Sequence, residues 1–299
     1  MTGGPARPEI YSRRAWLATR ALDVLPWPWG ERALSALFVA AALARPTRLR
    51  RALAWAGQQS GGAKGRWRLA LSCSAEHGRS VARQALVGIR TPEDLRRLVA
   101  VEGAEHLEGR TGGAILLGFH TGPLGVPVAL RAAGVHLTWM GGPRDAARWS
   151  AEAWRAQREI DASLEMARGA ALSQPAESRG ALLYQARRFL LDGGVVYVAA
   201  GGWGREAFVV QLPGGAARVR SGWFILRRGC GVPVLPVLAR LSGQTLVITI
   251  HPPLPPPVPD AAADLEACRA RIAPLLEDYL RRFPQQCFAL MRRASLGRR

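Results

Sequence analysis

The stretch at residues 112–134, GGAILLGFHTGPLGVPVALRAAG, constrains the fold of this chain most strongly. Residues 114–119 form an apolar run that is opened by a glycine pair and is too short for a helix, so it predicts a buried strand. His120 follows directly, and a Thr-Gly-Pro turn then leads into a predicted helix that ends at Gly134. Strand, turn and helix in this order place His120 at the carboxyl end of a strand. Open α/β sheets usually carry their sites at that edge.

Two interpretations of His120 follow from its place in the sequence. A histidine at a sheet edge is a candidate general base, because a neutral imidazole accepts a proton near pH 7. A structural histidine whose ring bonds a nearby carbonyl group explains the same residue equally well.

Strand and helix patterns alternate along the rest of the chain. Residues 135–140 and 195–200 read as strands, and residues 177–191 between them read as a helix. We expect residues 216–229 to form a helix, and the two prolines within residues 232–241 favour an edge or bent strand there. The predicted fold class is therefore α/β, with a mixed central β-sheet flanked by helices and a helical region at the N-terminus.

The N-terminal part of the chain predicts a separate helical region. Residues 11–57 read as amphipathic helix with many tryptophans and arginines, and the longest apolar run, 33–44, is shorter than the ~20 residues that span a bilayer. An interfacial helix on an anionic bilayer and a helical hairpin packed on the main domain both fit this pattern. The glycine-rich break at 58–66 predicts a membrane-associating region at 1–60 and an α/β domain at 61–299.

The charge of the chain points to an anionic partner. Lysine and arginine number 41 against 22 acidic residues, which gives a net charge of +19, and Lys64 is the only lysine. Because the planar guanidinium group suits phosphates, nucleic acid, anionic lipid headgroups and an acidic carrier protein are all candidates. Nucleic acid is disfavoured because the sequence has no basic motif interleaved with aromatic residues.

The four cysteines predict neither a metal site nor a redox motif. Cys73, Cys230, Cys268 and Cys287 are widely spaced, and none forms a CxxC pair or a zinc-ligand cluster. We expect free thiols in a reducing compartment, with no metal and no cofactor. The sequence also lacks HExxH, GxSxG and GxxxxGK[ST], the usual motifs of zinc proteases, α/β-hydrolases and P-loop enzymes.

Two pairs of arginines are candidates for binding an anionic substrate. Arg144 and Arg148 follow the predicted strand at 135–140, and Arg218 and Arg220 lie at the start of the helix expected at 216–229. A helix N-terminus favours anions, and arginine there adds bidentate binding of phosphate. Solvated surface arginines are the alternative interpretation of both pairs.

Several sequence blocks, taken in order, resemble the lysophospholipid acyltransferase superfamily. Within it, the chain is similar to the bacterial lipid A biosynthesis acyltransferases that add a secondary acyl chain, such as a lauroyl group. The resemblance covers about residues 67 to 293. It lies in HTGPLG after an apolar strand, in VVYVAAGGWG, in VVQLPGGAARVRSGWFILRRGCGVPVLPVLARL, in HPPLP and in the closing LEDYLRRFPQQCFALMRR.

The resemblance implies a membrane-associated acyltransferase. It would move a fatty acyl group from a thioester of acyl carrier protein or coenzyme A to a hydroxyl or amine of a lipid acceptor, for example a lipid A precursor. By this resemblance the enzyme lies at the cytoplasmic face of the bacterial inner membrane and needs no metal. His120 would act as the base, and Thr121 with backbone amides of its turn would hold the acyl carbonyl. Substrate binding would involve Gly122, Arg144, Arg148, Gly214, Arg218 and Arg220.

The chain departs from this family at the second half of its motif. The family has a histidine, four residues and then Asp or Glu, whose carboxylate orients the imidazole, whereas this chain has Gly125 at that position. A backbone carbonyl group, Asp145 or Glu206 are alternative orienting groups. The departure also keeps a second interpretation open, namely a catalytically inactive homologue that binds lipid or serves as a scaffold.

Overall fold

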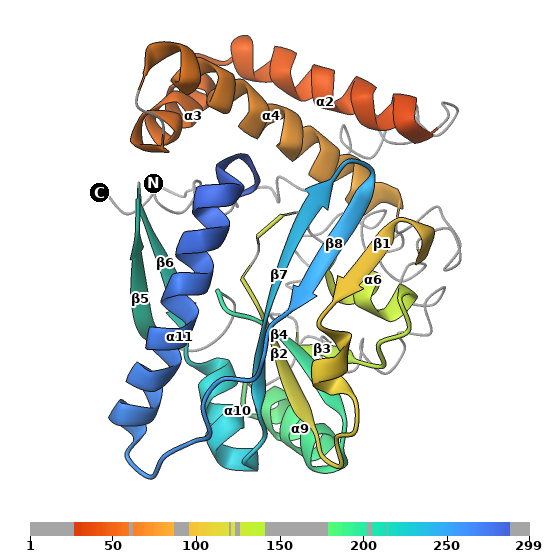
Figure 1. The fold of residues 1–299 in the computed structure, drawn as a ribbon, viewed down its shortest axis with the longest axis vertical. Helices are drawn as coiled ribbons and strands as arrows, with labels where there is room; N and C mark the ends of the chain where they lie inside the picture. The colour runs from red at the N-terminus through yellow and green to blue at the C-terminus, as the bar shows by residue number, and fades with distance from the viewer. Residues whose placement is uncertain are drawn as a thin grey trace, which may run out of the picture.

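A six-stranded mixed β-sheet forms the centre of the molecule (Figure 1). The computed structural model describes residues 27–59, 62–86, 96–119, 121–122, 126–140, 179–201, 205–213 and 215–287. The strand order is β1-β8-β7-β2-β4-β3; β7, β2, β4 and β3 are parallel, β8 is antiparallel to β7, and β1 is parallel to β8. The bounds are β1 Val99–Glu102, β2 Ala114–Gly118, β3 Thr138–Met140, β4 Val195–Ala199, β7 Val234–Ser242 and β8 Thr245–Ile250. The predicted α/β class with a mixed central sheet is confirmed.

Strand β2 is the most deeply buried strand of this sheet, with all five residues inaccessible to solvent. Ile115 and Leu117 belong to the core on one face of the sheet, and Ala114 and Leu116 belong to the core on the other face. A strand that is covered on both faces needs a continuous apolar run. The strand predicted at residues 114–119 is therefore confirmed.

Helices cover both faces. On one face, α6 (Val126–Ala132) packs against the core that contains Leu116. On the other face lie α9 (Arg179–Leu191), α10 (Gly222–Cys230) and α11 (Ala261–Arg282), together with the short 3-10 turn η3 (Pro284–Gln286). A second 3-10 turn, η1 (Ala104–Leu107), follows β1. The helix predicted at residues 177–191 is confirmed as α9.

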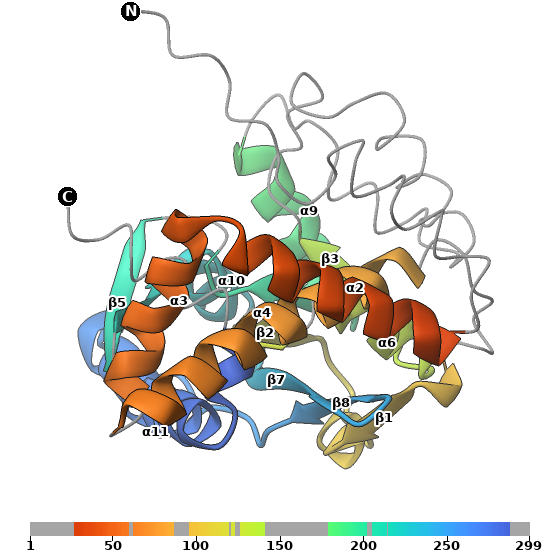
Figure 2. The same ribbon diagram turned by 90° about the horizontal axis from the view of Figure 1, so that it is seen from above.

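Three N-terminal helices form a layer over one end of the sheet, as Figures 1 and 2 show. They are α2 (Trp27–Leu43), α3 (Pro46–Gln59) and α4 (Ala63–Leu86). Strand β7 runs towards this layer, which therefore lies at the carboxyl end of the parallel strands. Arg79 of α4 donates to the carbonyl of Gly243 in the turn after β7. The predicted N-terminal helical region is confirmed for residues 27–59; in the described part of the chain, no helix combines the length and apolarity needed to cross a bilayer.

The helix expected at residues 216–229 is wrong in its first part. Residues 215–220 are strand β6 (Gly215–Arg220), which pairs with β5 (Glu206–Leu212) in an antiparallel hairpin outside the main sheet. Ala217 and Val219 are buried while Arg218 is exposed, and this alternation has the period of two that a strand requires. Helix α10 begins only at Gly222.

Strand β7 is internal to the sheet, between β8 and β2, so the expectation of an edge strand is wrong. Pro233 precedes the strand. The antiparallel pairing of β7 with β8 begins at Val237, one residue after Pro236. The carbonyl of Pro236 accepts a bond of 2.9 Å from the amide of His251. A proline is tolerated at this position because no ladder partner requires its missing N–H.

Candidate functional site

The carboxyl ends of three parallel strands meet at Gly118, two residues before His120 in the sequence. Gly118, the last residue of β2, is in register with Ala199 of β4 and with Val237 of β7. The carbonyl of Gly118 accepts a bond of 2.7 Å from the amide of Ala200, the residue after β4. The predicted placement of His120 after a central parallel strand follows from the bounds of β2, although His120 itself lies outside the described residues.

The two covalent neighbours of residue 120 are both buried. Phe119 packs into the core on the face of α11 and is 6% exposed. Thr121 is 2% exposed, and its hydroxyl oxygen accepts a bond of 3.3 Å from the amide of Ala239 in β7. The structure therefore brings Thr121 to the sheet edge as a buried side chain bonded to backbone. Its predicted role in holding an acyl carbonyl stays a prediction.

Tyr279 of α11 completes the surroundings of Thr121. Its hydroxyl donates to the carbonyl of Ala239 over 2.6 Å. Burial raises the pKa of Tyr279 well above its ordinary value, and a hydrogen bond with Thr121 opposes part of that rise. The backbone N–H and C=O of Ala239 are thus both bonded to side-chain hydroxyl groups.

Gly122 makes a close backbone approach that other residues cannot make. Its φ is +66°, and a Cβ there would lie 2.2 Å from the carbonyl oxygen of Ala239. Its amide donates a bond of 3.1 Å to the carbonyl of Gln286. Since this amide is already bonded, an acyl carbonyl would have to be held by other donors of the turn.

Gln286 fixes this turn from the other side. It is 7% exposed; its side-chain oxygen accepts from the amide of Leu241 over 2.7 Å, and its side-chain nitrogen donates to the carbonyl of Leu241 over 2.9 Å. The segment FPQQC belongs to a block of the family resemblance, but the sequence alone indicates no role for Gln286 or Tyr279. We call the set Thr121, Gly122, Ala239, Leu241, Tyr279 and Gln286 the clamp.

The β5–β6 hairpin borders the same edge. The amide of Arg220 donates a bond of 2.7 Å to the carbonyl of Ala200, so the end of β6 joins the end of β4. Arg218 forms an ion pair of 2.8 Å with Glu206 of β5, and both side chains are accessible. The expected position of Arg218 and Arg220 at a helix N-terminus is wrong, because both residues lie in strand β6. Arg144, Arg148, Gly214, Gly125 and Asp145 lie outside the described residues.

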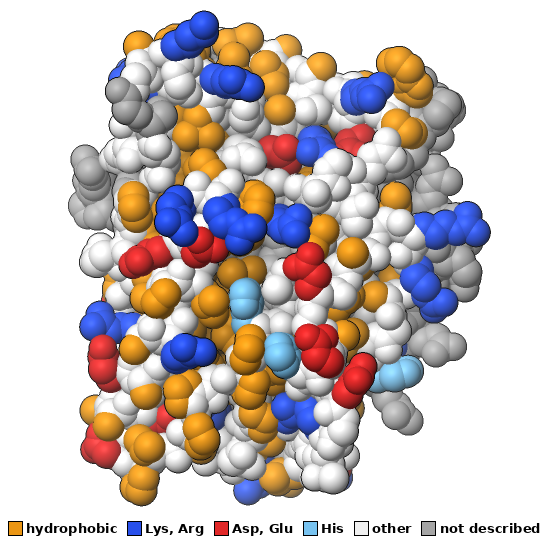
Figure 3. All heavy atoms as spheres, in the orientation of Figure 1, with side chains coloured by type: hydrophobic (Ala, Val, Ile, Leu, Met, Phe, Trp, Pro, Cys, Tyr) orange, Lys and Arg blue, Asp and Glu red, His pale blue; other side chains and the backbone are white. Residues whose placement is uncertain are grey.

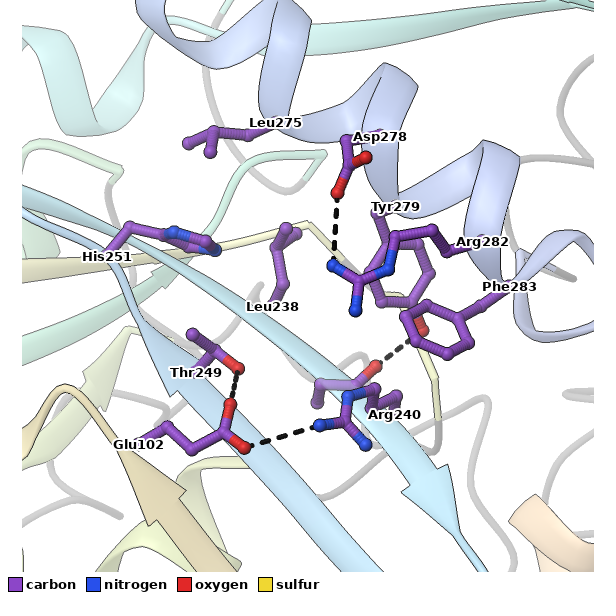
Figure 4. Close-up of a pocket in the computed structure, with 11 residues that line it drawn as sticks. Glu102, Leu238, Arg240, Thr249, His251, Leu275, Asp278, Tyr279, Arg282 and Phe283 are labelled. Atoms are coloured by element: carbon purple, nitrogen blue, oxygen red, sulfur yellow. Dashed lines mark hydrogen bonds and ion pairs between the residues drawn. The ribbon is translucent and has the colours of Figure 1, made fainter.

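A pocket of about 150 Å³ opens between α11 and the strands β7, β8 and β1 (Figure 4). Glu102 accepts bonds from Thr249 at 2.7 Å and from Arg240 at 3.3 Å. The guanidinium groups of Arg240 and Arg282 lie 5.5 and 5.3 Å from the ring centre of Phe283. Ala239 and Tyr279 of the clamp also line the pocket. The sequence alone does not reveal this pocket, because β1, the neighbouring strands β7 and β8, and helix α11 come from three separate parts of the chain.

The pocket carries charges of both signs. Arg282 pairs with Asp278 at 3.3 Å, and Figure 3 shows basic and acidic side chains intermixed over the face that is viewed there. Burial lowers the pKa of His251 in the pocket wall; His106 lowers it further, and Glu102 opposes the shift. With its guanidinium groups already facing carboxylates, the pocket lacks a net charge that would select an anion.

No group of three or more metal-ligating side chains occurs among the described residues. All four cysteines are free; Cys73, Cys268 and Cys287 are buried and Cys230 is partly accessible. Burial raises the pKa of Cys73 to about 12 and that of Cys268 to about 11. These thiols therefore stay protonated at neutral pH, which suits packing and not nucleophilic chemistry.

Comparisons with known proteins assign no family to the chain. No family model matches it, and no curated protein sequence matches it. The resemblance to the lysophospholipid acyltransferases therefore stays a prediction from the sequence blocks.

Proposed function

We propose that the chain is a membrane-associated acyltransferase. It moves a fatty acyl group from a thioester, on acyl carrier protein or coenzyme A, to a hydroxyl or amine of a lipid acceptor, with His120 as general base. The observation that carries this proposal is the sheet edge on either side of residue 120 in the sequence: β2 ends at Gly118, at the carboxyl edge of the parallel strands, and Phe119 and Thr121 are both buried.

The proposed reaction needs one base and no cofactor. His120 takes the proton of the acceptor hydroxyl while that oxygen attacks the carbonyl carbon of the thioester. The C–S bond then breaks, and the imidazolium returns its proton to the departing thiolate. One ester replaces one thioester, and no electron or proton is left over. Backbone amides of the turn after residue 120 would stabilise the oxyanion of the intermediate.

A lipid acceptor is supported by the N-terminal layer. Trp29, Leu37 and Leu43 of α2 are exposed by 60%, 53% and 51%, and Arg32 lies 5.3 Å from the ring centre of Trp29. Tryptophan, leucine and arginine on one exposed helix face suit the boundary of an anionic bilayer. This layer lies over the carboxyl edge of the sheet, the edge at which β2 ends. By the family resemblance, we propose that the protein acts at the cytoplasmic face of a bacterial inner membrane.

Arginines supply the proposed recognition of the anionic groups. Arg218 on the hairpin is accessible and lies on the strand whose end joins β4. A phosphate of the acceptor or of the carrier could replace Glu206 as its partner. Arg144, Arg148 and Arg220 complete the proposed set.

Gly125 favours a second candidate function. Without the acidic residue of the family motif, the histidine lacks its usual orienting group, and loss of that group costs about 10⁴ in rate in the serine-protease triad. The second candidate is therefore a non-catalytic protein that binds lipid at the same edge.

One experiment separates the two candidates. Purified, detergent-solubilised protein is given radiolabelled acyl carrier protein or acyl-coenzyme A together with a total lipid extract. We expect a labelled lipid from the native protein and a loss of turnover of about 10²- to 10⁴-fold in His120→Ala. His136→Ala, a change of an exposed histidine, is the matched control. Unchanged turnover in His120→Ala would refute the mechanism, and lipid binding without transfer by the folded native protein would favour the second candidate.

A further inference from the structure

We propose that Gln286 and Tyr279 are positioning residues, which hold the turn after residue 120 against β7 and thereby set where residue 120 lies. The structural part of this proposal stands on hydrogen bonds alone. Its catalytic part rests on the proposed function, in which residue 120 is the base.

The clamp supplies hydrogen-bond partners to the part of β7 that extends beyond the end of β2. The pairing of β2 with β7 stops at Gly118 and Val237, so Ala239 and Leu241 lie beyond the last pair. Buried backbone groups need partners. Side chains supply them: Thr121 accepts from the amide of Ala239, and Tyr279 donates to the carbonyl of the same residue.

Gln286 serves Leu241 in the same way. Its amide group forms both bonds to the backbone of Leu241, as a neighbouring strand would. Because both ends of the side-chain amide are bonded, the position of Gln286 is fixed, and its main-chain carbonyl is then placed to accept from the amide of Gly122. Trp55 of α3 also donates to the carbonyl of Pro284 over 3.4 Å, which ties the same 3-10 turn to the N-terminal layer.

Two separate sets of hydrogen bonds therefore restrain Thr121 and Gly122, which are consecutive in the chain. Tyr279 acts on Thr121 through Ala239, and Gln286 acts on Gly122 directly. Gly122 also lies so close to β7 that an added Cβ would be 2.2 Å from the carbonyl oxygen of Ala239. Both residues that follow residue 120 in the sequence are therefore restrained by hydrogen bonds.

The sequence gives a reason why this restraint matters for catalysis. Catalytic groups need to be held within about 0.5 Å of their productive position, and the carboxylate that normally orients the histidine is replaced by Gly125. In this chain, restraint of the backbone on one side of residue 120 stands in for part of that missing contact. Neither Gln286 nor Tyr279 is proposed to touch the substrate.

The test uses two variants with matched controls. Tyr279→Phe removes one hydroxyl and keeps the ring; Tyr184→Phe, at an exposed tyrosine of α9, is its control. Gln286→Ala removes both bonds to Leu241; Gln285→Ala, at the neighbouring and more accessible glutamine of the same 3-10 turn, is its control. Melting temperature confirms that each variant is folded, and Tyr279→Phe remains the informative variant if Gln286→Ala does not fold.

The first readout is amide hydrogen exchange in the full-length protein. We expect exchange in the peptide that contains residues 119–122 to become about tenfold faster in Tyr279→Phe and Gln286→Ala, the effect of losing about one hydrogen bond. Exchange in β1 and β8 should stay unchanged, as should the peptide itself in both controls. Unchanged exchange at residues 119–122 in both folded variants would overturn the proposal.

The second readout is steady-state acyl transfer. We expect kcat to fall by about 10- to 100-fold with KM for the thioester unchanged, because a misplaced base slows the chemical step and leaves binding intact. A rise in KM at constant kcat would overturn the positioning role. If the native protein transfers no acyl group, the proposed function fails while the exchange result still decides whether the clamp holds the turn.

Discussion

The clamp and the β5–β6 hairpin, which both border the carboxyl edge of the sheet, are built in opposite ways. On the side of β7 and α11, the clamp is buried, and its polar groups bond to backbone atoms. The β5–β6 hairpin, which packs against α11 and joins the end of β4, instead carries an ion pair whose Arg218 and Glu206 side chains are 58% and 36% exposed. Buried bonds to backbone fix a geometry, whereas an accessible pair is free to exchange its partner for a ligand. The clamp therefore serves as the scaffold side, and the hairpin side carries the candidate binding surface.

Helix α11 supports the scaffold side along its whole length. Near its N-terminus, Asp264 accepts a bond of 2.6 Å from Arg227 of α10, and both side chains are 1% exposed. Arg227 also donates to the carbonyl of Pro255 and to the sulfur of Cys268. At its C-terminal end, the same helix supplies Tyr279 to the clamp. The same helix thus carries a buried ion pair near its N-terminus and a residue of the clamp near its C-terminus.

Loss of this buried pair should have the largest effect on stability. Asp264→Ala leaves the guanidinium of Arg227 buried without its carboxylate, so we expect the free energy of unfolding to fall by about 3–5 kcal/mol. Urea unfolding measures it. Glu266→Ala, which breaks the exposed pair of Glu266 with Arg269 at 2.9 Å, is the control and should change the same quantity by about 0.5 kcal/mol or less. A loss below about 1 kcal/mol in Asp264→Ala would show that α11 is held by packing alone.

Substitution of Gly122 should have the next largest effect. Gly122→Ala adds a methyl group 2.2 Å from the carbonyl of Ala239 at a φ of +66°. Gly109→Ala is a matched control, because Gly109 has the same φ of +66° and no atom within 4 Å of an added Cβ. We expect about 1 kcal/mol from the backbone conformation alone in Gly109→Ala and about 1–3 kcal/mol more in Gly122→Ala, measured by urea unfolding. Equal losses would mean that the clamp yields to the added methyl group.

The contrast between these two sides also explains what the sequence could predict. Strand β2 was predictable because a strand buried on both faces is encoded by one continuous apolar run. Strand β6 was not, because Val219, Trp223 and Phe224 also suit a helical face, and only the pairing with β5 decides for a strand. Strand β1 was missed because its partner β8 lies far along the chain, with Val99 opposite Leu246.

The candidate site was predictable only in part, for the same reason. The edge at residue 120 follows from local order: strand, turn, helix. The clamp depends on contacts between Thr121 and Ala239, 118 residues apart, and between Leu241 and Gln286, 45 residues apart. The sequence around Tyr279 and Gln286 does not indicate that these side chains form hydrogen bonds to the backbone of a strand, because the same local pattern suits residues that only pack at the end of a helix.

On the hairpin side, we expect an effect on binding with little effect on stability. Under the proposed function, Arg218→Ala should raise KM for the acyl acceptor roughly tenfold, the loss of one charged hydrogen bond, at a nearly constant kcat. Its free energy of unfolding should change by about 0.5 kcal/mol or less, because the ion pair with Glu206 is exposed. Arg269→Ala, which removes an exposed and paired arginine of α11, is the control. An unchanged KM would remove Arg218 from the proposed binding surface.

The smallest expected effect is a response of the scaffold side to acid. Burial lowers the pKa of His251, which lines the pocket beside Ala239 and Tyr279, below its ordinary value of 6.5; the charge of His106 adds to the shift and Glu102 opposes it.

The sign follows from proton binding. Below pH 6.5 the unfolded chain binds a proton at His251 more readily than the folded chain does, so the free energy of unfolding falls as the pH drops from 6.5 through the lowered pKa and is unaffected by His251 above 6.5. His251→Gln should therefore lose less stability between pH 7.5 and pH 5.5 than the native protein, in urea unfolding at the two pH values. His136→Gln, at an exposed histidine, should respond as the native protein does. If the free energy of unfolding falls equally in the native protein and in His251→Gln between these pH values, groups other than His251 cause the acid response of the scaffold side. The pocket beside the clamp would then accept a charged histidine at as little cost as the exposed hairpin accepts its charges.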